Sequence, residues 1–543
     1  MLLAQVLLLL IPFVIAQHDF SHMGRYRKLR EGSAVWRAPE TELSKEKIAH
    51  NFGRFGHNVE HAERARKAMR RRHGHHGKRV KGGHEEGKHP HGHQKRVDEI
   101  AALHENAETD RPSIHEINAN LLPYLYNGDI VLSSHQINEI EAATPEEGET
   151  SATPSATAKP QDGKQVAATD KPAASRRRRG APIITLNLWD VNKEISFMFG
   201  KNMTDIKTQD LIRKTLGNIQ SATCLKFREY TGTANLEYFK GDGCYSSLGR
   251  LKNRTSQGIS IGVGCEIPGI IAHETLHAIG LDHTQTRKDR DVHVSVNAAV
   301  IKDSYIGNFQ KNSDKDNDNF GTSYDYGSVL HYGAFDFSNS AKPSLVPLET
   351  GFADTMGQRL RVQFNDFKMV NSLYKCAEHA KCTIKCQNGG YPNPKNCNKC
   401  VCSDFYDGDK CEKLKFTVAV TRARNISFTS EFDAAANKAG NNYNFDKFLV
   451  ALPTVVEVAA GKRVNATFLK MYAGFGQLPC YAKCPFTAIE LVDGSDLSRA
   501  GQKFCCGNEV GRSVIFPTNR IGFKAYASPG MPFEATVSFS AAN

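Results

Sequence analysis

The first 223 residues of this 543-residue chain contain no cysteine, whereas the remainder contains all 14. Disulfides therefore cannot hold the N-terminal part, and the even count in the later part indicates paired disulfides in a secreted chain. A chain of this length is too long for one hydrophobic core, so we expect several domains. The cysteines form groups of four, six and four, one group for each of three domains: Cys224, Cys244, Cys265 and Cys376; Cys382, Cys386, Cys397, Cys400, Cys402 and Cys411; Cys480, Cys484, Cys505 and Cys506.

Long apolar runs are also scarce, and residues 1–16, MLLAQVLLLLIPFVIA, form the one clear case. This run is shorter than the roughly 20 residues of a membrane span and ends in small residues, although no Lys or Arg precedes it. We expect a cleaved secretory signal over 1–16, an extracellular protein and no membrane span. Four sequons are compatible with secretion: Asn202, Asn253, Asn425 and Asn465.

Acidic residues are fewer than basic ones, 58 against 70, which gives a net charge of +12. Much of the excess comes from basic runs such as Arg70–Arg72 and Arg176–Arg179. In a secreted chain such runs indicate processing sites and solvated segments rather than nucleic-acid binding. Residues 17 to about 115 are polar, His-rich and without clear periodicity, so we expect most of them to be disordered. The His-rich part, 73–96, implies no fixed ligand geometry, and loose metal binding there is the less favoured alternative.

Residues 143–175 have the composition of a linker, and four arginines follow at 176–179. A basic-specific secretory protease could reach this site and cut after Arg179, which would leave Gly180 as the new N-terminus. A nuclear-import or anion-binding run is the alternative, but it does not suit a chain with a secretory signal. We therefore predict a propeptide over residues 17–179.

The sequence HETLHAIGLDH contains the residues for a catalytic metal site. His273 and His277 stand four residues apart, on one face of a helix. Gly280 permits a left-handed turn that brings His283 to the same ion. Three protein ligands leave a position for water, as in catalytic zinc sites, and Glu274 is placed to take the proton of that water. The alternative is a buried helix with satisfied core histidines, which the full motif disfavours far more than the short one does.

With this motif the chain resembles the astacin family of metzincin zinc peptidases over residues 120–376. The resemblance implies an α+β metzincin-type catalytic domain over 180–376, one Zn²⁺ on the helix with the histidines, and hydrolysis of protein substrates. In the segment SVLHY at 328–332, Tyr332 is implied as a further zinc ligand that stabilises the oxyanion. The implied disulfides are Cys224 with Cys376 and Cys244 with Cys265, whereas the sequence alone allows three pairings.

Two further segments resemble functional parts of this family. Tyr126-Asn127-Gly128-Asp129 resembles an aspartate switch, in which Asp129 occupies the open zinc position of the precursor; an ordinary Gly-Asp surface turn is the alternative. The segment MGQRLR at 356–361 resembles part of the substrate cleft in relatives that favour an acidic residue after the scissile bond. Arg359 or Arg361 would supply that preference, unless both are simply solvated.

Two positions depart from the family pattern. Thr284 follows the third histidine, where most astacins carry a Glu that binds the new N-terminus, so this chain lacks the charge of the usual maturation contact. The segment at 328–332 resembles the family's Met-turn, which lies beneath the metal, but Leu330 stands in place of the methionine. An exchange of similar volume typically lowers the free energy of unfolding by under about 1.5 kcal/mol. All the groups that perform the chemistry are present, so activity is expected. An inactive matrix-binding protein that acts through its C-terminal modules is the alternative.

The remaining sequence indicates two small modules. Residues 377–414 resemble an EGF-like domain without a calcium signature, through Cys386-Gln387-Asn388-Gly389-Gly390 and the Cys400-Val401-Cys402 pair. Residues 415–543 alternate polar and apolar positions at 447–453, 463–472 and 534–540, which predicts a β-sandwich. The segment CPFTAIELVDG makes this part resemble a CUB domain, without a calcium site because Thr487 replaces an aspartate. This domain order resembles that of nematode astacins that act on cuticle or eggshell, which implies extracellular-matrix substrates.

Overall fold

The computed structural model describes eleven stretches of the chain: residues 27–28, 43–81, 93–104, 108–109, 112–143, 186–312, 317–430, 448–473, 482–505, 509–529 and 531–543. The expected signal peptide, the linker and the cleavage site at Arg179 and Gly180 lie outside these stretches, as do Cys480 and Cys506. Within them, no helix is both long and apolar enough to span a membrane.

A six-stranded sheet lies at the centre of the peptidase domain, in the order β3-β7-β8-β6-β4-β5. Strands β4, β5, β6 and β8 are parallel, and β7 runs antiparallel to β8. The bounds are β3 (Ile130–Val131), β4 (Ile195–Phe199), β5 (Phe227–Glu229), β6 (Leu236–Phe239), β7 (Cys244–Ser247) and β8 (Gln257–Ile261).

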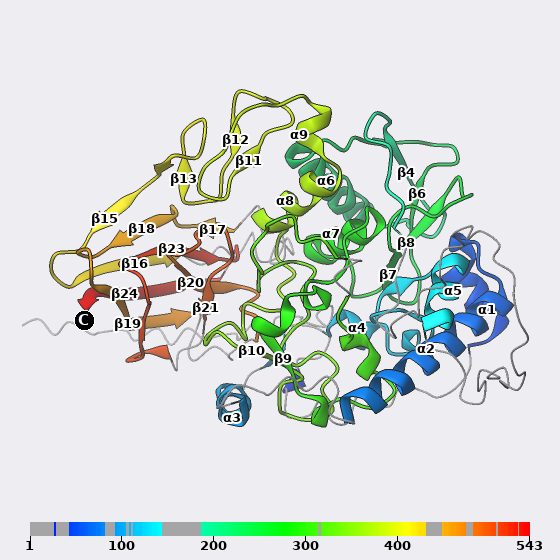
Figure 1. Cartoon of the computed structure of the whole chain (residues 1–543), viewed down its shortest axis with the longest axis horizontal. Coiled ribbons are helices and arrows are strands. Elements are labelled where there is room, and N and C mark those ends of the chain that lie inside the picture. The colour runs from blue at the N-terminus through cyan, green and yellow to red at the C-terminus, as the bar shows by residue number, and fades with distance from the viewer. Residues whose placement is uncertain are drawn as a thin grey trace, which may run out of the picture.

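Two helices cover one face of this sheet, α6 (Ile206–Ala222) and α7 (Pro268–Ala278) (Figure 1). Helix α6 is capped by Asp205, whose carboxylate accepts the amide N–H groups of Lys207 and Thr208. Its buried side chains pack against those of β4, β6 and α7. Helix α7 is buried almost throughout, as a helix between a sheet and a second layer must be.

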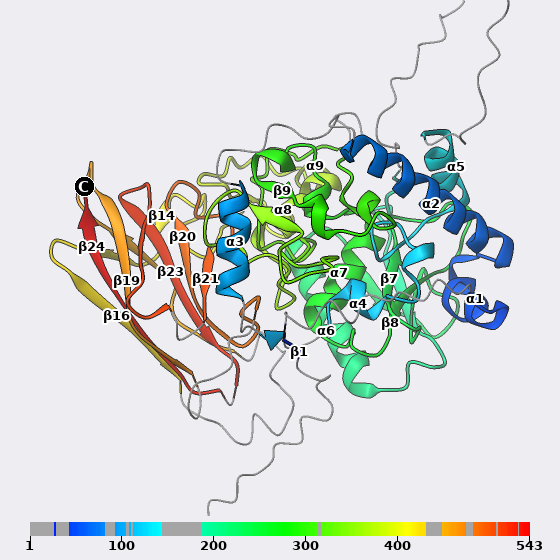
Figure 2. The same ribbon diagram turned by 90° about the horizontal axis from the view of Figure 1, so that it is seen from below.

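The opposite face of the sheet is covered by the N-terminal segment. Phe239 and Tyr245 point to this side and contact Phe52 and Phe55. The covering elements are α1 (Lys45–Phe52), η3 (Gly53–Phe55) and α2 (Val59–Lys81). Figure 2 shows α1 and α2 side by side at the outer end of the peptidase domain.

The expectation that most of residues 17–115 are disordered is therefore wrong for residues 43–81 and 93–104. The apolar residues of α2 are few and small, but Ala65, Ala68 and Met69 recur at helical spacing and pack against α5. The many charged residues around them conceal this pattern in the sequence. The other N-terminal elements are β1 (Arg27–Lys28), α3 (His93–Leu103), β2 (Glu108–Thr109), α4 (Ile114–Ile117), η4 (Leu122–Tyr124) and α5 (Ser134–Ala143).

After α7 the peptidase domain is largely irregular, with short 3₁₀ helices around an aromatic core. The disulfides Cys224–Cys376 and Cys244–Cys265 are those that the family resemblance implies. The elements of this part are η5 (Thr284–Thr286), η6 (Arg290–Val292), β9 (Val294–Val296), η7 (Ala298–Val300), η8 (Ile306–Phe309), β10 (Leu345–Pro347), α8 (Phe364–Leu373) and α9 (Cys376–His379).

The cysteine-rich module that follows has two small hairpins and three disulfides, whose pairing the sequence left open. They join Cys382 to Cys397, Cys386 to Cys400 and Cys402 to Cys411. The strands are β11 (Tyr391–Pro392), β12 (Cys400–Val401), β13 (Tyr406–Asp407) and β14 (Lys413–Leu414). Such a short module has too little core for stability without cross-links.

The C-terminal part consists of two packed sheets, as its alternating sequence predicts. One contains β15-β18-β23-β20-β21 with β17 beside β23, and the other contains β16-β24-β19-β22. Their inner faces share one core, and Cys484 is bonded to Cys505. The strands are β15 (Thr417–Ala419), β16 (Arg424–Ser430), β17 (Leu449–Val450), β18 (Thr454–Glu457), β19 (Arg463–Ala473), β20 (Thr487–Asp493), β21 (Gln502–Phe504), β22 (Ser513–Ile515), β23 (Arg520–Ala527) and β24 (Phe533–Ala542).

The sequons differ in accessibility. Asn253 and Asn425 are exposed. Asn202 is half-buried, and its amide group donates to Lys240 O at 2.6 Å and accepts from Lys240 N at 3.2 Å. Asn465 is also half-buried, within β19. Glycan attachment is therefore more compatible with the fold at Asn253 and Asn425 than at the other two.

Candidate metal centre

Helix α7 presents two of the predicted ligands. Pro268 stands in its first turn, where a missing N–H is tolerated. His273 and His277 are completely buried, and their Nε2 atoms lie 3.0 Å apart. Two imidazoles cannot both donate at this distance, so at least one nitrogen must present a lone pair. The two Nε2 atoms can lie this close only with a proton or a metal ion between them.

The third histidine arrives through a left-handed turn. Gly280 has φ +105°, and its N–H donates to His277 O at 2.8 Å while Leu281 N donates to Leu276 O. These bonds end the helix and reverse the chain, as C-terminal glycines commonly do. The ring of His283 then points back toward α7, and the centroids of the His283 and His277 rings lie 4.7 Å apart.

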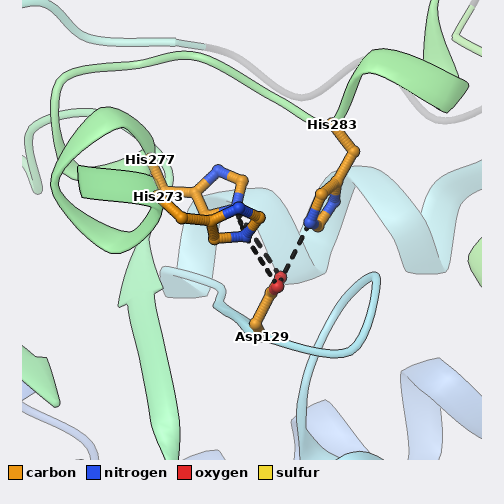
Figure 3. A group of neighbouring side chains, drawn as sticks. All are labelled: Asp129, His273, His277 and His283. Atoms are coloured by element: carbon orange, nitrogen blue, oxygen red, sulfur yellow. Dashed lines mark hydrogen bonds and ion pairs between the residues drawn. The ribbon is translucent and has the colours of Figure 1, made fainter. Parts of the chain in front are cut away.

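Asp129 of the N-terminal segment completes the group. Its Oδ2 lies 3.1 Å from Nε2 of both His273 and His283, and its Oδ1 lies 3.7 Å from Nε2 of His277. The four possible ligand atoms all lie within 4.8 Å of one another. Figure 3 shows the carboxylate opposite the three rings, on a loop that enters from the other side. The structure thus brings together the four residues that the sequence assigns to the metal and the switch.

The histidines are set up as metal ligands. His273 Nδ1 donates to Val329 O at 2.8 Å and His277 Nδ1 donates to Leu281 O at 2.7 Å, which leaves both Nε2 lone pairs toward the centre. Burial lowers the pKa of His273 to about 3 and those of His277 and His283 to about 4. All three are therefore neutral at pH 7, the form that binds metal.

Buried polar atoms without partners test whether a metal ion fits. Among the described residues, Asp129 Oδ1 and both oxygens of Glu274 are buried and have no hydrogen-bond partner. Unpaired buried carboxylates are costly, so such groups usually serve a ligand or a reaction. Burial, followed by the charge of Asp129, raises the pKa of Glu274 well above its ordinary value. Nitrogen donors with one carboxylate suit Zn²⁺, so the residues fit the ion.

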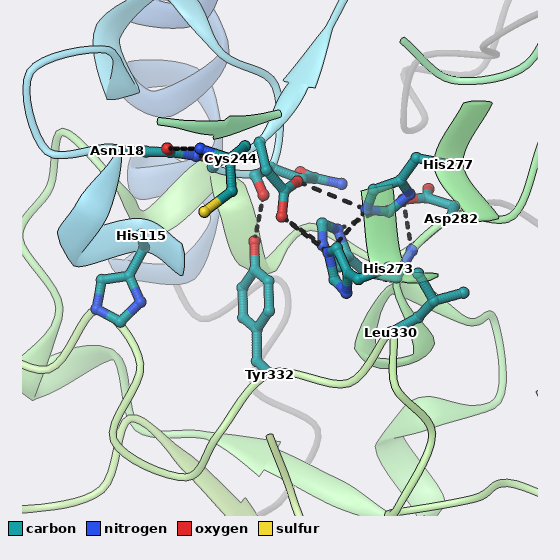
Figure 4. Close-up of polar contacts among 12 residues, drawn as sticks. His115, Asn118, Cys244, His273, His277, Asp282, Leu330 and Tyr332 are labelled. Carbon is teal, nitrogen blue, oxygen red and sulfur yellow. Dashed lines mark hydrogen bonds and ion pairs between the residues drawn. The ribbon is translucent and has the colours of Figure 1, made fainter. Parts of the chain in front are cut away.

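Tyr332 lies on the other side of the carboxylate. Its hydroxyl donates to Asn127 O at 2.6 Å (Figure 4). Its ring packs edge to face against the ring of His283, and the two ring centroids lie 4.8 Å apart. The N-terminal segment thus contacts Tyr332 as well as the three histidines. Burial, together with the charge of Asp129, raises the pKa of Tyr332 well above its ordinary value, so it remains a hydroxyl donor.

The turn that carries Asp129 is bound to the peptidase sheet. Asn127 and Gly128 have φ +48° and +84°, a left-handed pair that aims the aspartate at the histidines. Strand β3 pairs in parallel with β7, the edge strand of the peptidase sheet. Asn118 exchanges hydrogen bonds with Cys244 N and O, at 2.8 and 2.6 Å, and donates to Gly128 O at 3.0 Å. These contacts exclude the alternative of an ordinary surface turn.

Arg72 holds the same turn from helix α2. The basic run Arg70–Arg72 is not fully solvated as expected, because Arg72 is only 1% exposed. Its guanidinium lies 4.1 Å from the ring centroid of Tyr126 and donates to Asn127 Oδ1 at 2.9 Å and Gln310 Oε1 at 3.2 Å. Helix α2 thereby connects the turn before Asp129 to the peptidase domain.

Replacing Arg72 with Ala is expected to weaken latency. Hydrogen bonds to charged groups are worth about 1.5–3 kcal/mol, so peptide hydrolysis by the uncleaved precursor should rise about 10-fold or more. Exposed Arg70 provides the matched control, and Arg70→Ala should leave the activity of the precursor unchanged. Equal activities of the two precursors would show that Arg72 has no part in latency.

The two departures from the family pattern are accommodated locally. Thr284 Oγ1 donates to Ser328 Oγ at 2.8 Å, and Ser328 Oγ donates to Asp366 Oδ1 at 2.5 Å. Asp366 also accepts Val329 N at 3.0 Å, which fixes the carbonyl that orients His273. Leu330 is 3% exposed and packs in the core of the peptidase domain. Neither residue displaces a histidine from the centre.

The structure separates the two candidate specificity residues. Arg359 is half-buried, and its Nη1 donates to His331 O at 3.1 Å. Its positive charge only partly offsets the rise in the pKa of Glu274 that burial and the charge of Asp129 cause. Arg361 instead donates to Asp404 Oδ2 of the cysteine-rich module at 2.9 Å. Lys524 of the sandwich binds the same oxygen at 3.2 Å. Arg361 therefore belongs to the contact between the domains.

Sequence reasoning missed the residues that hold the N-terminal segment against the peptidase domain. Arg72 was concealed within a charge run, and only the spacing of the small apolar residues of α2 pointed to a packed helix. Asn118 stands 11 residues before Asp129 with no motif around it. The amide of Asn118 replaces a strand partner for Cys244, a role that depends entirely on tertiary structure.

Residues 184–375 match the family model described as Astacin, a peptidase family. Zinc metalloproteinase nas-31 of Caenorhabditis elegans is 30% identical over 439 residues, which cover 77% of this chain and 64% of that protein. Zinc metalloproteinase nas-36 of Haemonchus contortus is 30% identical over 423 residues, which cover 75% and 64%. The chain thus spans slightly less than two thirds of these relatives. High choriolytic enzyme 1, a hatching enzyme zinc-protease from Oryzias latipes, has a solved structure with 30% identity and a TM-score of 0.32, which covers 35% of this chain and 98% of that one.

Proposed function

Because residues 184–375 belong to the astacin family of zinc metalloproteinases, we propose that this chain is a secreted zinc metalloendopeptidase made as an inactive precursor. The observation that carries the proposal is the buried group of His273, His277 and His283 with Asp129 against it. The histidines and Glu274 form a catalytic site, and Asp129 comes from a segment that processing would remove.

His273, His277 and His283 would hold the zinc ion, which supplies the Lewis acid that activates water and polarises the scissile carbonyl. Glu274 takes the proton of the attacking water and passes it to the leaving amine. Tyr332, once Asn127 has left, donates its hydroxyl to the oxyanion of the substrate. Edge strand β7, freed from β3, offers backbone groups to an extended substrate.

Activation requires removal of the N-terminal segment. In the precursor Asp129 faces the three histidines, and Tyr332 is bonded to Asn127. A basic-specific protease that cuts after Arg179 would produce a chain beginning at Gly180 and would allow residues 17–179 to leave. The region 17–179 is thus the propeptide, and the aspartate switch is its inhibitory element.

The C-terminal parts are proposed to be an EGF-like domain over 377–414 and a CUB-like domain over 415–543. The first-to-third, second-to-fourth and fifth-to-sixth disulfides of the cysteine-rich module support the former. The two-sheet sandwich supports the latter. This domain order resembles that of nematode astacins, from which we infer substrates in extracellular matrix, cuticle or eggshell.

The rival proposal is a matrix-binding protein without activity, which Thr284 and Leu330 motivate. Full-length protein cleaved after Arg179 should contain one zinc ion per chain by elemental analysis. It should also produce internal cuts in a denatured protein substrate, identified as new N-termini by mass spectrometry. One bound zinc ion without any cut would favour the matrix-binding protein, since its histidines remain but its chemistry is lost.

A further inference from the structure

A groove along helix α7, the helix that carries His273 and His277, is built from three parts of the chain. The peptidase domain supplies Ile270 of helix α7 and Arg359, the sandwich supplies Lys483 and Pro485, and the N-terminal segment supplies Ile114. The N-terminal segment therefore forms one wall of this groove. Its removal would uncover a wall to which the C-terminal domain contributes.

Lys483 reaches into the peptidase domain. Its Nζ lies 3.5 Å from Asp336 Oδ1. A Cβ added to Gly333 would lie 2.8 Å from Lys483 Cε, and one added to Gly357 would lie 3.3 Å from it. The lysine stem thus lies over two glycines of the peptidase domain, and a side chain at Gly333 would displace it.

The base of this lysine is held firmly. Lys483 N donates to Asp354 Oδ1 of the peptidase domain at 3.0 Å. The next residue, Cys484, forms the disulfide with Cys505, and its carbonyl accepts the hydroxyl of Tyr526 at 2.9 Å. The backbone at Lys483 is thus attached both to the peptidase domain and to the core of the sandwich.

The side chains that line the groove carry more positive than negative charge. The positive charges of Lys483 and Arg359 both lower the pKa of Asp336. The carboxylate of Asp336 also accepts a hydrogen bond from Gly333 N at 2.8 Å. In the precursor His115 lies 3.8 Å from Asp336 as well, but it belongs to the prosegment. Among the described residues that line the groove, two cations then face the single carboxylate of Asp336 after activation, and a carboxylate of the substrate would balance them.

From this juxtaposition we propose that Lys483 of the C-terminal sandwich is a specificity-determining residue of the peptidase, which binds an acidic side chain of the substrate beside Arg359. This inference rests on the proposed peptidase function. The C-terminal domain then has a direct part in substrate choice at the catalytic groove, in addition to any binding elsewhere on its surface.

Cleavage of a peptide library by the activated full-length chain tests the inference. Peptides with Asp, Glu, Asn or Gln at each of three positions on either side of the scissile bond would be compared by mass spectrometry. Lys483→Ala should lower kcat/KM for peptides acidic at one position by about 10-fold, with their neutral counterparts changed by less than about 2-fold. Lys483→Arg should retain most of the preference. Lys470→Ala, an exposed lysine of β19, should match the wild type.

The outcomes separate the two proposals. A wild-type enzyme that cleaves nothing contradicts the peptidase function itself. An active enzyme whose Lys483→Ala variant keeps the wild-type preference at every position contradicts only the role of Lys483. An equal loss on acidic and neutral peptides, with a lower melting temperature, would assign Lys483 a structural role and also overturn the inference.

Discussion

Glu274→Gln is expected to lower the kcat/KM of the activated chain by about 1000-fold, within the range typical of a positioned general base. The amide cannot accept the proton of the attacking water. Glu274 is completely buried, and its oxygens have no partner among the described residues, so the substitution removes no hydrogen bond. Thermal stability should therefore be retained or slightly improved, as is common where a polar group is kept for function.

Hydrolysis of a quenched fluorescent peptide, together with zinc content and a melting curve, measures this effect. Glu194→Gln makes the same chemical change at a half-exposed ion pair with Arg228 and should leave all three values unchanged. A Glu274→Gln enzyme with more than about a tenth of wild-type activity would exclude this residue as the base.

Asp129→Asn is expected to activate the uncleaved precursor. The amide keeps the size of the side chain but removes the charge that faces three histidines at 3.1 to 3.7 Å. Removing one partner of a buried charged contact typically costs about 2–5 kcal/mol, and 2 kcal/mol alone corresponds to a rise in precursor activity of about 30-fold. The increase should exceed that of Arg72→Ala, which acts on the same turn indirectly.

The activity of the precursor must be measured with processing excluded, by a gel of the same sample at the end of the assay. Asp98→Asn, at an exposed position of helix α3 that pairs with Lys342, is the matched control and should leave the precursor silent. An Asp129→Asn precursor as inactive as the wild type would show that α2 and β3 block the cleft without the aspartate.

The metal centre could be predicted from the sequence because its geometry is local. His273 and His277 share a helix face, and the left-handed Gly280 determines where His283 arrives. Asp129 was found only through the family resemblance, since no spacing relates residue 129 to residue 273. The pairing of β3 with β7 brings them together.

Other parts of the structure depend on contacts that a sequence does not display. Arg72 and Asn118 act on residues far along the chain, and their own surroundings in the sequence resemble a solvated segment. Arg361 and Arg359 are only two residues apart, yet one binds the cysteine-rich module and the other lies beside the catalytic centre. The alternation of apolar residues was enough to predict the sandwich, because that pattern repeats over many residues.

The most direct test of the central claim is the rate of peptide hydrolysis by wild-type chain cleaved after Arg179, recorded before chelation, after chelation and after zinc is returned. The account predicts turnover that the chelator abolishes and that added Zn²⁺ restores. A cleaved chain that binds zinc but shows no turnover at any stage, or turnover that chelation leaves intact, would contradict it.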